Sequence, residues 1–114
     1  MVALVPSRAD ARRLALAGGV PADKLHLTLY YLGDAADFDL STRAAVANAV
    51  RAMVTRRRIG AVTARVYGAN LWHPDGEDPC WVWAVGDPEP RPSGQDSLAA
   101  VRGMVDESWH DGAV

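Results

Sequence analysis

Residues 25–32, LHLTLYYL, alternate leucines with other side chains, and this pattern restricts the possible folds more than any other in the chain. Side chains at alternate positions of a β-strand project from opposite faces. The run therefore predicts a strand whose leucines pack against a core. The opposite face carries His26, Thr28 and Tyr30. A polar face of this kind either contacts water or forms part of a functional site.

The rest of the sequence predicts three helices and three further strands. Helical spacing of apolar residues predicts helices over residues 7–17, 41–58 and 97–109. Short apolar or alternating runs predict strands over residues 2–5, 61–71 and 80–85. We expect Ser7 and Ser41 to be helix N-caps, and the Pro74-Asp75-Gly76 turn to join the last two strands as a hairpin. The order β-α-β-α-β-β-α predicts an α+β fold with one domain over residues 1–114.

The composition is that of an ordinary soluble domain and does not identify a partner. The chain has 114 residues and a formal net charge of −2, which provides no overall basic field for nucleic acid. A single cysteine, Cys80, excludes an intrachain disulfide and is compatible with a reducing compartment. No apolar run approaches the roughly 20 residues of a membrane span. We therefore expect a cytoplasmic protein that does not bind membranes.

His26-Leu27-Thr28 lies in the middle of the alternating strand, after a strand–helix unit and before Leu32-Gly33. This arrangement resembles the first signature of the two-histidine (2H) phosphoesterases, in particular the 2′-5′ RNA ligase-like proteins that act as RNA 2′,3′-cyclic phosphodiesterases. The segments VALVPSRAD, VTARVYGANLW and PCWVWAVGD follow the order of that family. The resemblance implies an antiparallel sheet with His26 and Thr28 on its concave side and helices packed on the leucine face.

The resemblance also implies a metal-free reaction that needs no cofactor. In this family, two His-x-Thr/Ser strands face each other across a phosphodiester. Two imidazoles can act as general base and general acid near neutral pH, and each hydroxyl can donate to a phosphate oxygen. His26 and Thr28 would be the catalytic residues, and the substrate would be a 2′,3′-cyclic phosphate or a 2′-5′ phosphodiester of an RNA terminus or small nucleotide.

Only the first of the two family motifs is present. Neither His73 nor His110 is followed by threonine or serine two residues later. Three explanations remain open: the sequence is part of a longer protein, another chain supplies the second motif, or the site is incomplete. Because a general acid and a general base each contribute about 10²–10⁴-fold, we expect little phosphodiesterase activity from one motif alone.

Three further residues are candidates for substrate binding. Tyr30 continues the face of His26 and could stack on a base, although an aromatic residue there also suits packing. Arg65 and Tyr67 share the polar face of the next strand, where an arginine could pair with phosphate or lie exposed in water. We predict that Trp81 and Trp83, which share one strand face, belong to the core rather than to a base-stacking surface.

Two alternatives to an enzyme follow from the missing motif. The chain could be a binding module that holds a nucleotide or RNA end without hydrolysing it. It could also be a half-domain that forms a homodimer, because an absent strand leaves a sheet edge that proteins generally cover. In a two-fold dimer, two copies of His26 could face each other and restore the pair.

Overall fold

The computed structural model describes residues 1–93 and 95–110 and has an α+β architecture. Its strands and helices follow the predicted order. They are β1 (Val2–Leu4), α1 (Arg8–Leu14), β2 (Leu27–Tyr30), α2 (Leu40–Arg56), β3 (Arg65–Trp72), β4 (Cys80–Gly86) and α3 (Leu98–His110). Single 3-10 turns at Ala22–Lys24 and Ala35–Asp37 precede β2 and α2.

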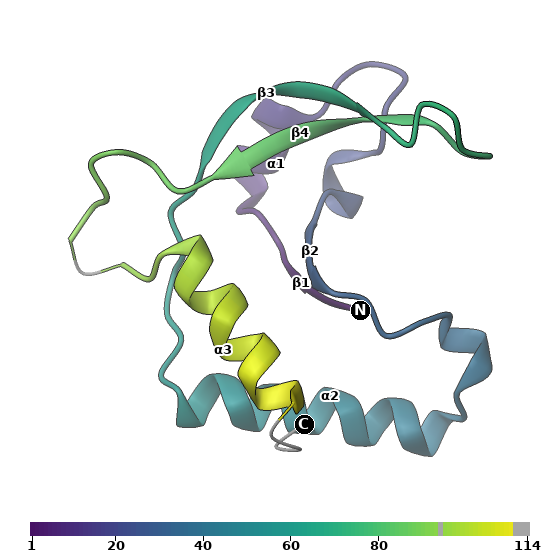
Figure 1. Cartoon of the computed structure of the whole chain (residues 1–114), viewed down its shortest axis with the longest axis vertical. Helices are drawn as coiled ribbons and strands as arrows, with labels where there is room; N and C mark the ends of the chain where they lie inside the picture. Colours follow the sequence, from purple (N-terminus) through teal and green to yellow (C-terminus); the bar gives the residue numbers. More distant parts are fainter. Residues whose placement is uncertain (94, 111–114) are drawn as a thin grey trace.

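The described strands form two separate antiparallel pairs, so the prediction of one sheet is wrong. β1 pairs with β2 in the register Val2 to Tyr30 and Leu4 to Leu27, and β3 pairs with β4 from Arg65–Gly86 to Trp72–Cys80. In Figure 1 the β3–β4 hairpin spans the top of the molecule and the β1–β2 pair lies below it. Alternation predicts which face a strand buries, but it carries no information about the strand's neighbours.

Each pair contains an irregularity that local alternation does not reveal. The register shifts between Val2 and Ala3 in the first pair and between Val66 and Gly68 in the second. Gly68 has a φ of 154° at its shift, a conformation that glycine adopts without the clash of a Cβ atom. Such shifts change which face the following side chains occupy.

Two helix ends differ from the predictions. Ser7 caps α1 as predicted, with its side chain accepting from the Asp10 N–H at 3.1 Å. The helix ends at Leu14, before residue 17, and the Leu14 carbonyl accepts the Trp83 indole N–H at 3.0 Å. The cap of α2 is Asp39 rather than Ser41, because the Asp39 carboxylate accepts the Thr42 N–H at 2.7 Å.

The core lies where β1–β2 meets α2 and α3. Val2, Met53 and Val105 form a buried cluster, which is surrounded by the partly buried residues Leu29, Tyr30, Leu32, Val50 and Ile59. Figure 1 shows the end of α3 over α2, with the β1–β2 pair above α2 and to the right of α3 in this view. Strand β2 is therefore anchored from its leucine face, as the alternation predicts.

Much apolar surface remains outside this core. The accessible area is 8485 Å², whereas a folded monomer of 12.2 kDa exposes about 6,100 Å². The radius of gyration is 15.5 Å, against about 13 Å for a compact chain of this length. Among the exposed side chains are Trp72 and Trp81 of the hairpin.

None of the helices in the described ranges has both the length and the apolar composition needed to cross a bilayer.

Candidate functional site

The prediction that His26 lies in the middle of the strand is wrong, because β2 begins at Leu27 and His26 immediately precedes it. One of its ring nitrogens is already engaged. Its Nδ1 atom lies 2.9 Å from the carbonyl oxygen of Lys24, at the end of the preceding 3-10 turn. Because a carbonyl oxygen only accepts, Nδ1 carries the hydrogen in this contact. In the neutral ring, Nε2 then carries the free lone pair, and the side chain is exposed. This arrangement suits a group that accepts a proton from a ligand in solvent.

Thr28 lies within β2, opposite Ala3 of β1, and its hydroxyl is exposed. The hydroxyl donates to the sulfur of Met1 at 3.2 Å. A thioether sulfur is a weak acceptor, so a phosphate oxygen would be a better partner for this donor. Thr28 is therefore free to exchange its present partner for an anionic ligand.

The two residues form an open pair rather than the lining of a cleft. Exposed His26 and Thr28 alternate with the half-buried Leu27 and Leu29, as the sequence predicts. Within the described chain, no hydrogen bond joins the imidazole to the threonine hydroxyl. Among the described residues, neither of the two lines the cavity beside α1 or the larger cavity between β2 and α2. The pair can reach a ligand from solvent, but these cavities do not enclose it.

Tyr30 makes packing contacts, which was the alternative to substrate binding that the sequence left open. Its ring centroid lies 5.0 Å from that of Trp109, with the planes tilted by 30°, and the side chain is half-buried against the core cluster. The register shift between Val2 and Ala3 interrupts the alternation that placed Tyr30 on the face of Thr28. Tyr30 also lines the larger cavity, so its proposed contact with substrate stays a prediction.

Arg65 and Tyr67 contact each other at the start of β3. The Arg65 guanidinium carbon lies 5.1 Å from the centre of the Tyr67 ring, and the Tyr67 hydroxyl donates to the Asp87 carbonyl at 2.5 Å. In the described residues, no hydrogen bond or ring contact joins either of them to β2. Their role in substrate binding stays a prediction, and it would require a ligand that reaches the other strand pair.

The other two histidines lie in different parts of the molecule. His73 follows β3 at the hairpin turn, with a φ of 50° and an edge contact of 4.7 Å to the Trp72 ring. His110 ends α3 and lies 3.3 Å from the Asp106 carboxylate. Figure 1 shows the hairpin turn far from β2, whereas the end of α3 packs against β2 through the Tyr30–Trp109 contact. Within the described residues, no hydrogen bond or ring contact joins His73 or His110 to His26.

The larger cavity was not anticipated from the sequence. It has a volume of about 720 Å³ and lies between the end of β2 and helix α2. Its lining includes four aromatic residues and two arginines, which are Tyr30, Tyr31, Phe38, Trp109, Arg43 and Arg51. The available signal was the helical spacing of the two arginines around Val46, Ala47 and Val50.

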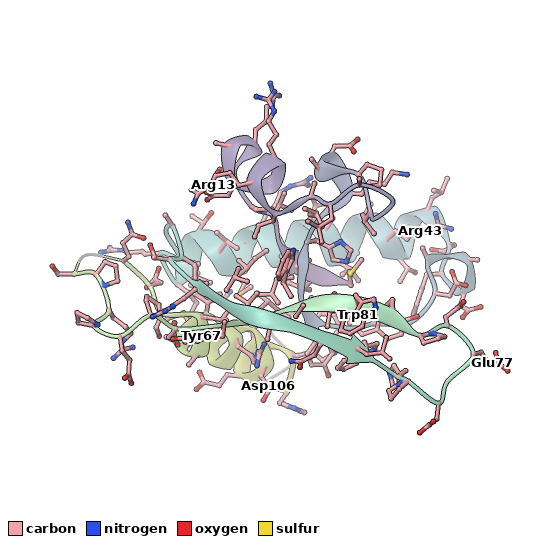
Figure 2. The ribbon with its side chains drawn as sticks, turned by 90° about the horizontal axis from the view of Figure 1, so that it is seen from above. Arg13, Arg43, Tyr67, Glu77, Trp81 and Asp106 are labelled. Atoms are coloured by element: carbon pink, nitrogen blue, oxygen red, sulfur yellow. The ribbon has the colours of Figure 1, made fainter. Side chains whose placement is uncertain are left out.

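The hairpin contains one further difference from the sequence predictions. Trp83 is half-buried through its contact with α1, but Trp81 is 73% exposed, so its assignment to the core is wrong. Tyr67 and Trp81 lie at separate positions along the hairpin (Figure 2). Cys80 is exposed. Residues 1–93 and 95–110 contain no cluster of three or more His, Cys, Asp or Glu side chains suited to a metal ion.

Comparison of the chain with protein-family models, with curated proteins and with solved structures yields no match.

Proposed function

We propose that the chain acts on a 2′,3′-cyclic phosphate or 2′-5′ phosphodiester of RNA or a small nucleotide, with His26 transferring a proton and Thr28 holding the phosphate. The fold implied is that of the first half of a 2H phosphoesterase. The observation that carries this proposal is the orientation of His26, whose Nδ1 is fixed by the Lys24 carbonyl while the ring stays exposed. The reaction class comes from the resemblance of His26-Leu27-Thr28 to the first motif of the 2H phosphoesterases.

The chemistry assigned to His26 follows from its tautomer. With Nδ1–H donating to the main chain, the Nε2 lone pair can take a proton from an attacking water or hydroxyl. After it is protonated, the same ring can return the proton to a leaving oxygen. Thr28, two residues along the strand, would donate to a non-bridging phosphate oxygen after leaving the Met1 sulfur. Neither step uses a metal.

Hydrolysis of a 2′,3′-cyclic mononucleotide by the purified chain tests this proposal. We expect weak turnover that falls about 10²–10⁴-fold in His26→Ala, because a positioned general base contributes that much. His110→Ala is the matched control, since it removes an exposed imidazole at the end of α3 and should leave turnover unchanged. Thr28→Val keeps the β-branched shape and should lower turnover about 10-fold or more.

The opposite outcome would favour the binding alternative. If the wild-type chain and His26→Ala released product at the same rate, while both still bound the cyclic nucleotide, the chain would be a nucleotide-binding module. Loss of turnover in His110→Ala equal to that in His26→Ala would contradict the assignment of the proton-transfer role to His26.

A second candidate role is that of a half-domain completed by another copy of the chain. The excess of roughly 2,400 Å² in accessible area is larger than the roughly 800 Å² that each partner buries in a stable interface. Each described strand also pairs with only one neighbour, so open edges are available for a second chain. The exposed Leu71 and Trp81, which are partners in the hairpin register, would lie at the centre of this interface.

Light scattering after size-exclusion chromatography tests the dimer. We expect a mass of twice 12.2 kDa at high concentration and the mass of a monomer for Trp81→Glu. Leu16→Glu is the control, because it places the same charge on an exposed apolar residue of another region. A monomeric mass for the wild-type chain throughout the accessible concentration range would contradict this role.

A further inference from the structure

The cavity between β2 and α2 combines aromatic walls with positive charge. Tyr30, Tyr31, Phe38 and Trp109 contribute rings from three parts of the chain, and Arg43 and Arg51 come from α2. None of the described carboxylates lines the cavity, although the whole chain carries a net charge of −2. The local charge is therefore opposite in sign to the overall charge, and the cavity favours an anion.

Both guanidinium groups retain donors for a ligand. The Arg43 Nε–H donates to the Phe38 carbonyl at 3.0 Å, and one Arg51 amino group donates to the Asn48 side chain at 3.2 Å. An arginine has five N–H donors, so most of them stay available. Within the described chain, neither arginine forms an ion pair with a carboxylate.

Two of the three carboxylates that shortly precede Arg43 in the sequence accept main-chain hydrogen bonds at helix starts. Asp34 accepts the Ala36 N–H at 3.0 Å, and Asp39 accepts the Thr42 N–H at 2.7 Å. Neither contributes to the lining. Among the described residues, no carboxylate forms an ion pair with Arg43, so its guanidinium can bind an anionic ligand.

The two arginines differ in how firmly they are placed. Arg43 is held by a main-chain carbonyl, whereas Arg51 contacts only an exposed side chain on its own helix. Eight residues of α-helix separate them, a rise of about 12 Å. Val46, Ala47 and Val50 line the apolar stretch between them. A ligand with a flat apolar part and one anionic end matches this arrangement.

We propose that this cavity binds a nucleoside monophosphate, with the base against the aromatic rings and the phosphate on Arg43. Base–aromatic stacking is tolerant of sequence, and a planar guanidinium suits a phosphate. The site lies beyond the reaction proposed above and does not require it, because neither His26 nor Thr28 lines the cavity.

Isothermal titration of the full chain with AMP, adenosine and inorganic phosphate tests the proposal. We expect AMP to bind more tightly than either fragment, since only AMP uses both parts of the cavity. Arg43→Gln should weaken AMP binding about 10-fold or more, as loss of a charged hydrogen bond does. Arg51→Gln should weaken it less, and Arg56→Gln, on the same helix outside the lining, should have no effect.

A second pair of variants tests the cavity without changing charge. Ala47→Trp should fill it and abolish AMP binding, whereas Ala44→Trp, also exposed on α2 but outside the lining, should not. Circular dichroism of each variant checks that α2 is retained. Equal AMP affinity in the wild type, Arg43→Gln and Ala47→Trp would overturn the proposal. The proposal would also be overturned if the wild-type chain bound no AMP but formed a dimer that Ala47→Trp abolished. A second copy of the chain would then occupy the cavity.

The result is distinguishable from a failure of the proposed reaction. His26→Ala should keep the wild-type affinity for AMP while losing turnover of the cyclic nucleotide. Loss of AMP binding in His26→Ala would mean that AMP binds at the HLT strand, and it would overturn a separate site in this cavity.

Discussion

Helix α3 and the β3–β4 hairpin are both rich in apolar residues, but only the helix buries them. Along α3, Leu98, Val101, Val105 and Ser108 are buried on one face. The hairpin has a long register of paired residues and no buried side chain, and Trp81 is 73% exposed. A backbone ladder can therefore hold two strands together without a core beneath them. The side chains of such a hairpin stay available for another surface.

The largest expected effect on stability concerns the buried cluster to which α3 contributes. Met53 is 1% exposed and belongs to the cluster with Val2 and Val105. Met53→Ala should lower the free energy of unfolding by about 2–5 kcal/mol, because it leaves a cavity in the buried cluster. Urea denaturation measures this loss. The neighbouring Val54→Ala, at a position 38% exposed, is the control and should cost less than about 1 kcal/mol.

A smaller effect separates the two tryptophans of the hairpin. Trp83→Phe removes the indole donor to the Leu14 carbonyl and should lower the free energy of unfolding by about 1 kcal/mol. Trp81→Phe should change it by less than about 0.5 kcal/mol under conditions where the chain is monomeric. Urea denaturation at low protein concentration compares the two. Equal losses would show that the exposed half of the hairpin is packed in solution.

This pair also illustrates what the sequence could predict. The order of elements, the Ser7 cap and the exposure of His26 and Thr28 follow from spacing and capping, which depend on nearby residues. Trp81 and Trp83 occupy equivalent positions in the same alternation. Their different burial depends on α1, which supplies the Leu14 carbonyl from 69 residues away. No local pattern contains that contact.

The candidate site divides in the same way. Alternation predicts the exposure of His26 and Thr28, but a register shift against β1 takes Tyr30 out of the pattern and into contact with Trp109. Arg65 and Tyr67 are neighbours on one strand, as predicted, but the pairing of β3 with β4 alone leaves them on a separate sheet from His26. The pairing of strands is a property of the whole fold and could not be predicted from periodicity.

Loss of the contact that joins the β3–β4 hairpin to α3 should have an intermediate effect on the free energy of unfolding. Asp87, just after β4, accepts the Leu98 N–H at 2.6 Å and the Ala99 N–H at 3.2 Å, so its carboxylate caps α3. Asp87→Ala should cost about 0.5–2 kcal/mol of the free energy of unfolding. Asp87→Asn retains one acceptor oxygen and should cost less. If Asp87→Ala were neutral in urea denaturation, the Ser97 hydroxyl, which accepts from Ala100, would be a sufficient cap.

The smallest effect concerns pH and the start of α2. Hydrogen bonds from the Thr42 N–H, and then from its hydroxyl, hold the pKa of Asp39 below its ordinary value. A carboxyl group whose pKa is lower in the folded state contributes stability above its unfolded pKa and loses it as the pH falls through its folded pKa. The helical signal of the wild type should therefore decline more steeply in acid than that of Asp39→Asn, with the difference confined to this acidic window. Circular dichroism along a pH titration measures it. Because Asp39 starts the helix that carries Met53, identical titrations of the two proteins would mean that the packed core, rather than this cap, determines where α2 begins.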